Sequence, residues 1–295
     1  MTRTSFNIAA IIATVVLTAS CTAGSDVMEF EATNAKEQTV VNTTDVFAGF
    51  ATTRQQVAAS SSLVSFKDGW TSEDVINIYN NEKNTSFTVL SEGEHVELAP
   101  LSGNDVELNG QVTATYPAVK FMGGQASFTL NGQNGTYENL SRYFLMTASA
   151  NVCGSSLSLD FTKHVTVLKF NIDENLADGA YLTNATLRGN GICSQLDMKV
   201  NGAGLDITPA GSNELNVSLS RRGNDGYCYV AFYNTGEDFL LTVKDSEGGE
   251  HFINLNVNTL NGGCINEIPA DKFEGGYAIQ FGASVSDYNT SVYSI

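Results

Sequence analysis

The feature that most constrains the fold is an alternation of apolar and polar residues, which recurs in short runs along most of the chain. Successive side chains of a β-strand point to opposite faces of a sheet, so this pattern places one face in a core and the other in water. The alternation is clearest at 168–172, 215–220, 253–258 and 277–285, with similar short runs at 75–79, 112–116, 126–130 and 157–161. We find no amphipathic helical pattern longer than two turns. The chain is therefore predicted to be rich in strands.

Turn signals separate these runs. They are pairs of residues that favour tight turns, among them Asn131-Gly132, Asn134-Gly135, Asn201-Gly202, Asp225-Gly226 and Gly248-Gly249. Many short strands with such turns between them are typical of sandwiches and barrels. Apolar residues make up 42% of the chain, so the many polar turn residues do not indicate disorder. The sequence predicts an all-β fold of one or two domains.

The amino-terminal segment 1–20 has the pattern of a secretory signal peptide. Arg3 is its only charged residue, and a mainly apolar run follows at 8–17. This run is too short to cross a bilayer, which needs roughly 20 residues, but it suits the apolar core of a signal peptide. Small residues then precede Cys21, as in the lipobox of bacterial lipoproteins, where the cysteine thiol takes a diacylglyceryl group. The alternative is an ordinary signal peptide with an incidental cysteine.

Acyl chains on Cys21, such as palmitate, would anchor the protein without a transmembrane helix, because each buried methylene contributes about 0.8 kcal/mol. Residues 21–39 are mostly polar and have no periodic pattern of apolar residues. They are therefore predicted to form a tether between the lipid anchor and the folded part. The acidic residues of this tether resemble the surface-export signal of Bacteroidetes lipoproteins, and the alternative is a solvated linker. We expect a protein that is lipid-anchored to the outer membrane and exposed at the cell surface.

The charge balance excludes several kinds of partner. The chain has 15 basic and 32 acidic residues, for a net charge of −17 at pH 7. Such a surplus of negative charge repels nucleic acid and anionic lipid surfaces. We therefore expect no nucleic-acid partner and no polybasic contact with a membrane.

Four cysteines follow Cys21 in the chain, and they are Cys153, Cys193, Cys228 and Cys264. Exported proteins meet oxidising conditions, so disulfides are permitted, and four cysteines allow three pairings among which the sequence does not choose. The cysteines lie tens of residues apart without a CxxC pair, which argues against a zinc site. At least one of them is a candidate for an unpaired buried thiol.

No motif points to catalysis. His95, His164 and His251 lie on or beside predicted strands, and none is spaced from a cysteine or a second histidine as metal ligands are. The sequence contains no GxSxG, P-loop, HExxH or GxGxxG motif. Acidic pairs such as Glu92 and Glu94 would act as acid and base only if the fold brought them together in a cleft. We expect a protein that is not an enzyme and needs no cofactor or metal.

Four short segments follow one another in a distinctive order. They are 66–79 with Trp70 and Tyr79, 114–117, 135–146 and 159–170. In this order they resemble the Bacteroidales fimbrillin-like family, and the resemblance covers about 66–295, by pattern alone in the second half. A tryptophan that the family shows near the carboxyl end is absent here, and Tyr288 lies near its place. The resemblance implies two tandem transthyretin-like β-sandwich domains, which we place at 40–164 and 165–295.

The resemblance also implies a role and a way of assembly. The family forms type V fimbriae, in which a protease cuts after an arginine near the amino end, removes a first strand and leaves a groove for a donor strand from another subunit. Here 40–50 is a candidate first strand, and Arg54 follows it in a mostly polar stretch that a protease can reach. Main-chain hydrogen bonds provide the affinity of such strand addition. The alternative is that Arg54 is a solvated charge of a loop.

The place of this chain in a fimbria depends on whether it carries a donor strand. After the predicted strand at 277–285 there follows the short segment 286–295. This segment is short for a donor strand with its linker, which favours an anchor, tip or accessory subunit over a stalk subunit.

A glycan-binding surface lipoprotein is the alternative function, because it would share the anchor, the tether and the sandwiches. Its sugar platforms would be exposed aromatic side chains, and the candidates are Tyr181, Tyr227, Tyr229, Tyr233 and Tyr288. Tyr227 and Tyr229 alternate on one predicted strand, a position more typical of a core.

Overall fold

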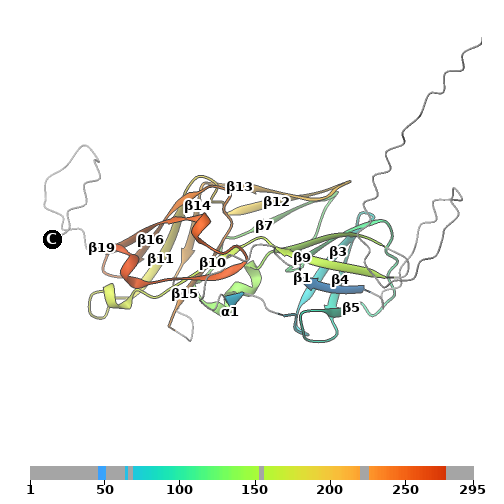
Figure 1. The fold of residues 1–295 in the computed structure, drawn as a ribbon, viewed down its shortest axis with the longest axis horizontal. Helices are drawn as coiled ribbons and strands as arrows, with labels where there is room; N and C mark the ends of the chain where they lie inside the picture. Colours follow the sequence, from blue (N-terminus) through green and yellow to red (C-terminus); the bar gives the residue numbers. More distant parts are fainter. Residues whose placement is uncertain (1–45, 51–63, 66–68, 153–155, 220–225, 277–295) are drawn as a thin grey trace, which may run out of the picture. The chain divides into compact units, whose positions relative to one another are not determined.

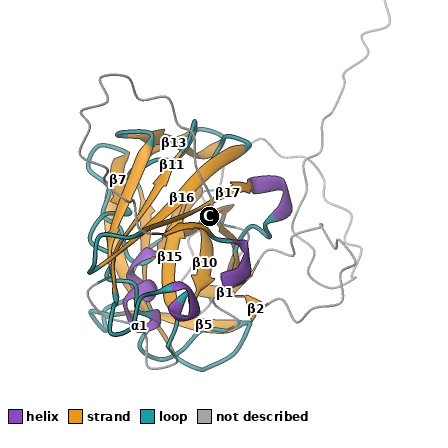
Figure 2. Ribbon diagram, turned by 90° about the vertical axis from the view of Figure 1, so that its left-hand side faces the viewer, coloured by secondary structure: helices purple, strands orange, loops and turns teal. Residues whose placement is uncertain are grey.

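The computed structural model describes residues 46–50, 64–65, 69–152, 156–219 and 226–276. Residues 38–295 group into one compact unit, and residues 1–37 lie wholly outside the described residues. The signal peptide, Cys21, the tether and Arg54 also lie outside them and stay predictions. No helix in the described ranges is long and apolar enough to cross a membrane. Strands dominate these ranges and the helices are short (Figure 2), so the predicted all-β class is confirmed.

Seven strands from the first half of the chain close into a barrel (Figure 1). Around the barrel they are β1 (Val46–Phe50), β5 (Val96–Pro100), β4 (Lys83–Val89), β3 (Val75–Asn80), β6 (Gln111–Tyr116), β8 (Met146–Asn151) and β9 (Leu157–Lys163). The sequence predicted a sandwich in this half. The sheet closes because β1 pairs on both of its edges, with β5 and with β9, and so joins the two ends of the sheet.

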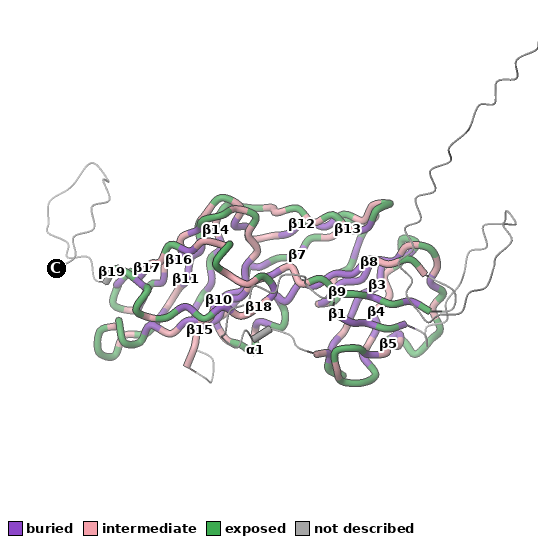
Figure 3. The backbone as a smooth tube through the Cα atoms, in the orientation of Figure 1, coloured by how far each residue is buried: buried purple, intermediate pink, exposed green. Residues whose placement is uncertain are grey.

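The core of the barrel is built from the inward-facing residues of the alternating strands, and the buried stretches follow the strands in Figure 3. Trp70, the only tryptophan of the chain, is buried among them. Its ring meets the rings of Tyr116 and Phe161 edge-on, at centroid distances of 5.5 and 5.1 Å. Such edge-to-face pairs contribute about 0.5–1.5 kcal/mol beyond the burial of their area. Trp70 therefore packs in the core and is not an exposed aromatic side chain on which a ligand could stack.

The β3–β4 hairpin turns through Asn81 and Glu82, which both have positive φ, 49° and 62°. Positive φ at both central residues defines the type I′ turn, whose twist matches that of the flanking strands. The side chain of Asn80 is buried beside this turn, and its Nδ2 donates to the carbonyl oxygens of Asn109 (2.8 Å) and Gln111 (2.9 Å). These bonds tie the hairpin to the start of β6.

Three further sheets contain the strands of the second half. The first has the order β15 (Cys228–Phe232), β10 (Thr166–Phe170), β18 (Cys264–Ile268) and β2 (Val64–Ser65). The second has the order β14 (Glu214–Ser218), β11 (Leu182–Arg188), β16 (Asp238–Asp245), β17 (Glu250–Asn256) and β19 (Glu274–Gly276). The third has the order β13 (Gly204–Ala210), β12 (Gln195–Asn201) and β7 (Gln125–Thr129). Their inner faces bury a core that includes Leu168, Leu187, Leu196 and Leu241.

Two strands that precede His164 in the chain pair with strands that follow it. β2 lies antiparallel to β18, with Val64 opposite Ile265, and β7 lies antiparallel to β12, with Ser127 opposite Asp197. The sheets of the second half thus incorporate chain from the first. The predicted boundary near His164, between domains at 40–164 and 165–295, stays a prediction.

The helices of the described ranges are single turns. They are α1 (Tyr137–Leu140), η2 (Ser141–Tyr143), η3 (Asp173–Asn175), η4 (Val257–Thr259) and η5 (Ala270–Lys272). Thr136 caps α1, because its hydroxyl oxygen accepts a hydrogen bond from the backbone N–H of Asn139 at 3.3 Å. The ring of Tyr137 then meets Tyr229 on β15 at a centroid distance of 5.4 Å, so α1 lies against that strand.

Candidate functional site: the first strand of the barrel

The candidate site is the place that β1 occupies between β5 and β9. β1 runs antiparallel to β5, with Val46 opposite Leu98 and Ala48 opposite Val96. It runs parallel to β9 over its whole length, from Val46 opposite Leu157 to Phe50 opposite Phe161. Every other neighbouring pair of this barrel, among the described strands, is antiparallel. The first strand predicted at 40–50 is therefore confirmed over 46–50, and it is a strand inserted between two others.

The two faces of β1 differ in burial. Val46 and Ala48 are buried in the barrel core, whereas Phe47 on the opposite face is 45% exposed. Burial of a valine side chain contributes about 1.5–3 kcal/mol. Loss of β1 would uncover the core at Val46 and Ala48 and would leave the edges of β5 and β9 unpaired. Such a groove is a template for another strand, and an aggregation hazard while it is empty.

Gly49 lies under the side chain of His95. A Cβ atom at Gly49 would lie 2.6 Å from His95 Nδ1 and 3.8 Å from the Asp160 carboxylate oxygen Oδ1. Real Cβ atoms do not approach other atoms that closely, so the His95 ring crosses the outside of β1 where the strand has no side chain. Asp160 is the residue of β9 opposite Gly49. The sequence contained no signal for this contact, because it joins β1 to the bend that precedes β5.

The chain on either side of Arg54 is held by different sheets. β1 ends at Phe50 in the barrel, and the next described strand, β2, pairs with β18 in the four-stranded sheet. Arg54 itself lies outside the described residues. A cut anywhere between the two strands would separate β1 from the rest of the chain while β2 kept its partner.

A second strand edge is closed by a side chain. The edge of β15 that faces away from β10 is met by Gln133, which is 3% exposed. The amide of Gln133 accepts from the Ala231 N–H and donates to the Ala231 carbonyl, both at 2.7 Å, and the Gly135 carbonyl accepts from Tyr229 N–H at 2.9 Å. A side chain and a loop thus take the place of a neighbouring strand. No sequence signal identified Gln133, because Ala231 lies far along the chain.

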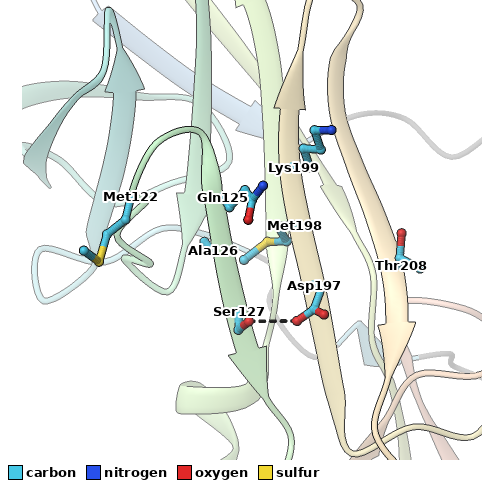
Figure 4. A pocket seen from close by; sticks show the side chains of 8 residues that line it. All are labelled: Met122, Gln125, Ala126, Ser127, Asp197, Met198, Lys199 and Thr208. Carbon is cyan, nitrogen blue, oxygen red and sulfur yellow. Dashed lines mark hydrogen bonds between the residues drawn. The ribbon is translucent and has the colours of Figure 1, made fainter.

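A shallow cavity of about 550 Å³ lies over the three-stranded sheet (Figure 4). Polar side chains line it from three strands, with Ser127 on β7, Asp197 and Lys199 on β12 and Thr208 on β13. The Ser127 hydroxyl donates to Asp197 Oδ1 at 2.7 Å, and Gln195 Nε2 donates to the same oxygen at 2.8 Å. These two bonds lower the pKa of Asp197, so the carboxylate stays ionised.

The histidines do not converge. Burial lowers the pKa of His164 to about 4, so this imidazole is neutral near pH 7, and its Nε2 lies 2.7 Å from the Thr147 hydroxyl. His251 is buried, with Nε2 3.3 Å from Asp245 Oδ2. His95 is the residue that covers Gly49. Among the described residues, no group of three or more His, Cys, Asp or Glu side chains is placed to hold a metal.

Three of the four cysteines after Cys21 are described. Cys193 is buried and free among the residues that the structure covers, and burial raises the pKa of its thiol. Cys228 is also buried and Cys264 is half-buried. Cys153 lies outside the described residues, so the disulfide pairing stays open.

The candidate sugar platforms are mostly covered. Tyr229 is buried, and Tyr227 and Tyr233 are half-buried. The Tyr227 ring is occupied by Lys169, whose Nζ lies 3.8 Å from the ring centroid. Tyr181 is 59% exposed, and Tyr288 lies outside the described residues. Of the described candidates, Tyr181 alone has the exposure that a platform needs.

Comparison with known proteins connects the fold to solved structures. No family model matches the chain, and none of the curated proteins matches it either. A candidate cell adhesion protein from Bacteroides uniformis has 14% sequence identity and a TM-score of 0.50, over 82% of this chain and 97% of that one. A second candidate cell adhesion protein, from Bacteroides ovatus, has 14% identity and a TM-score of 0.43, over 80% of this chain and 93% of that one.

The tip fimbrial protein Mfa3 from Porphyromonas gingivalis, truncated at its carboxyl end, has 10% identity and a TM-score of 0.33, over 73% of this chain and 81% of that one. At 14% identity, the likeness to the Bacteroides uniformis structure establishes a shared fold.

Proposed function

We propose that this protein is a fimbrial subunit of the cell surface, lipid-anchored through Cys21, that assembles with other subunits by strand addition and supports adhesion. The observation that carries the proposal is β1, a strand inserted between β5 and β9, with His95 lying over its Gly49. A protease cut after Arg54 would detach this strand and open its groove. The partners are then other fimbrial subunits, with a host or bacterial surface molecule as the adhesion target.

Two further features support this proposal. The linker between β1 and β2 joins two different sheets, so a cut in it would not remove the partner of β2. The edge of β15 is closed by Gln133, whereas the groove of β1 is closed by a strand that precedes a candidate cleavage site. An edge that is covered until export is a recognised protection against aggregation. The proposed role is structural, without a catalytic step or a cofactor.

Replacement of Arg54 tests the proposal in cells that produce the full chain. Arg54→Ala should reduce the fraction of surface protein found in high-mass assemblies that resist denaturation, since β1 would stay in place. Lys36→Ala is the matched control, because it removes a basic residue upstream of β1 and should leave assembly unchanged. Assembly that is equally efficient in the Arg54→Ala protein would contradict processing at this site.

Glycan binding is a second candidate, favoured by the polar cavity over the three-stranded sheet and by the exposed ring of Tyr181. The polar groups that line the cavity suit a ligand rich in hydroxyls, and the volume of the cavity lies within the range of small-ligand sites. A glycan array should then show saturable binding that Asp197→Ala abolishes. Asp238→Ala is the control, because Asp238 is also an exposed strand carboxylate that accepts a hydrogen bond, from Asn256 Nδ2 at 2.7 Å. Absence of saturable binding would remove this candidate.

A further inference from the structure

The outer face of the three-stranded sheet carries two neighbouring rows of exposed polar side chains. Each row takes one residue from β7, one from β12 and one from β13: the first is Gln125, Lys199 and Asp206, and the second is Ser127, Asp197 and Thr208. Figure 4 shows Gln125 and Lys199 above the hydrogen-bonded pair of Ser127 and Asp197. The cavity lies over both rows, so the pairing of the strands builds its floor.

A tight hairpin adds an apolar side chain to the first row. Met122 and Gln125 exchange two backbone hydrogen bonds, from Met122 N–H at 2.7 Å and from Gln125 N–H at 3.1 Å. Gly123 and Gly124 make the turn between them, with φ of 57° and 75°, as a type I′ turn requires. Met122 is 85% exposed, more than any other large apolar side chain of the described residues. Its flexible, polarizable side chain offers an apolar contact at the edge of a polar cavity.

The barrel holds this hairpin in place. Asn84 on β4 donates from Nδ2 to the Phe121 carbonyl at 2.7 Å, and its Oδ1 accepts from the Phe121 N–H at 2.8 Å. The Phe121 ring is buried against Tyr79, at a centroid distance of 5.1 Å. Successive residues of an extended chain point to opposite sides, so Lys120 and Met122 face away from this packing, and both are exposed. Lys120 is thus held on the same side of the chain as Met122.

Cations without a carboxylate partner gather around the hairpin. Elsewhere in the described ranges, the basic residues that form ion pairs with carboxylates are Lys169, Arg188, Lys244 and Lys272. Lys120 and Lys199 have no ion pair among the described residues, and neither has Lys83, which precedes Asn84. Arg142, on η2, is a further cation of this kind. In a chain with a net charge of −17, these lysines are the groups of this face that an anion would meet.

The two carboxylates of the face are engaged by other groups. Asp206, opposite Lys199, accepts from Asn201 Nδ2 at 2.6 Å. Asp197 Oδ1 accepts from Ser127 and from Gln195, whereas its Oδ2 has no hydrogen bond among the described residues. The cavity therefore presents a cation at Lys199 and a hydrogen-bond acceptor at Asp197.

The spacing of these two groups suits a single sugar residue. Lys199 and Asp197 are two residues apart on one face of β12, about 7 Å along the strand. An ammonium group only donates hydrogen bonds, and an ionised carboxylate only accepts them. A pyranose ring with a carboxylate on one side and hydroxyls on the other satisfies both groups. A neutral sugar would leave the charge of Lys199 without a partner.

We propose that the cavity over the three-stranded sheet binds an acidic glycan, through a sugar residue that carries a carboxylate. Lys199 pairs with this carboxylate, Asp197 accepts hydrogen bonds from hydroxyls of the ring, and Met122 packs on its apolar face. Lys120 adds electrostatic attraction at the hairpin. The inference rests on glycan binding, the second candidate function, and names the class of glycan. In a fimbrial subunit such a glycan would be the adhesion target.

Calorimetric titration of the protein recovered from the cell surface tests the charge of the ligand. The probes are an oligosaccharide of galacturonic acid, its methyl ester and a sialylated oligosaccharide. One of the two acidic probes should bind saturably and more weakly as salt is raised, and its identity names the kind of acidic sugar. The methyl ester keeps the ring hydroxyls but loses the charge, so it should bind at least about tenfold more weakly than the free acid.

Lysine variants test the site with the acidic probe that binds. Lys199→Gln should weaken binding about tenfold, because it removes the cation that pairs with the carboxylate. Lys244→Gln is the matched control, because Lys244 is an exposed strand lysine in an ion pair with Glu250, and it should leave binding unchanged. Equal binding to the Lys199→Gln protein would overturn the site.

The other outcomes separate this inference from the functions on which it depends. If neutral glycans, the methyl ester among them, bind as tightly as the acidic probes, the acidic class is wrong and glycan binding stands. An oligoglutamate peptide that binds as tightly as either acidic sugar would overturn the sugar and assign an acidic protein partner. If no glycan binds, both the inference and the glycan-binding candidate are wrong, whereas the proposed fimbrial assembly is unaffected.

Discussion

Replacement of Gln133 by leucine should destabilise the protein by several kcal/mol. The Gln133 amide is 3% exposed and makes three hydrogen bonds, two with Ala231 at 2.7 Å and one from Nε2 to the Leu130 carbonyl at 2.9 Å. Leucine keeps much of the volume but leaves the backbone N–H and C=O of Ala231 buried without these partners. A buried polar group left unsatisfied costs about 1–3 kcal/mol, so the two groups of Ala231 together cost roughly 2–6 kcal/mol.

Urea denaturation of the Gln133→Leu protein measures this loss, and hydrogen exchange locates it. The Ala231 amide should lose protection more than the amides of β10, since it is the group that Gln133 covers. Gln125→Leu is the matched control, because Gln125 is exposed on β7 and should change the free energy of unfolding by less than about 0.5 kcal/mol. A Gln133→Leu protein as stable as the control, with Ala231 still protected, would refute the claim that this side chain closes the edge of β15.

Three further predictions concern single positions. The pKa of His164 is about 4 in the folded protein, below the ordinary value of 6.5, so the unfolded chain takes up the proton first as pH falls. The free energy of unfolding should therefore drop by up to about 3 kcal/mol between pH 6.5 and pH 4. His164→Gln should remove that part of the pH dependence from the denaturation curves. Glu82→Gly should raise the free energy of unfolding by about 0.5–1 kcal/mol, because Glu82 has φ +62° in a turn that glycine adopts without strain; a lower midpoint in urea would contradict this. Gly236→Ala should lower the melting temperature by several degrees, because its Cβ would lie on the Asn190 carbonyl oxygen, whereas Gly262→Ala, with open space around it, should not.

Much of the strand content could be predicted from local pattern. The alternating runs at 75–79, 112–116 and 157–161 became β3, β6 and β9. β9 is buried at every second residue, as a half-buried strand requires, whereas β3 and β6 are buried on both faces. The first strand expected at 40–50 was found at 46–50 for the same reason, since Val46 and Ala48 face the core.

The pairings between distant segments could not be predicted from the sequence. β2 is two residues long and carries no pattern of its own, yet it extends the sheet at β18. Gln133 reads as a polar residue between two turn pairs, and its role depends on a strand edge about a hundred residues away. His95 over Gly49 likewise depends on the register of β1 against β5 and β9. Local sequence sets the type of element, whereas these contacts are set by which distant strands pair in each sheet.

The central claim is that β1 is a removable strand of a surface subunit. The amino-terminal sequence and mass of the protein recovered from the cell surface test it most directly. A chain that begins at Gln55, found in high-mass assemblies that resist denaturation, is the predicted result, because β1 would have been cut away and its groove filled by another subunit. A monomeric chain that still begins at acylated Cys21 would contradict the claim.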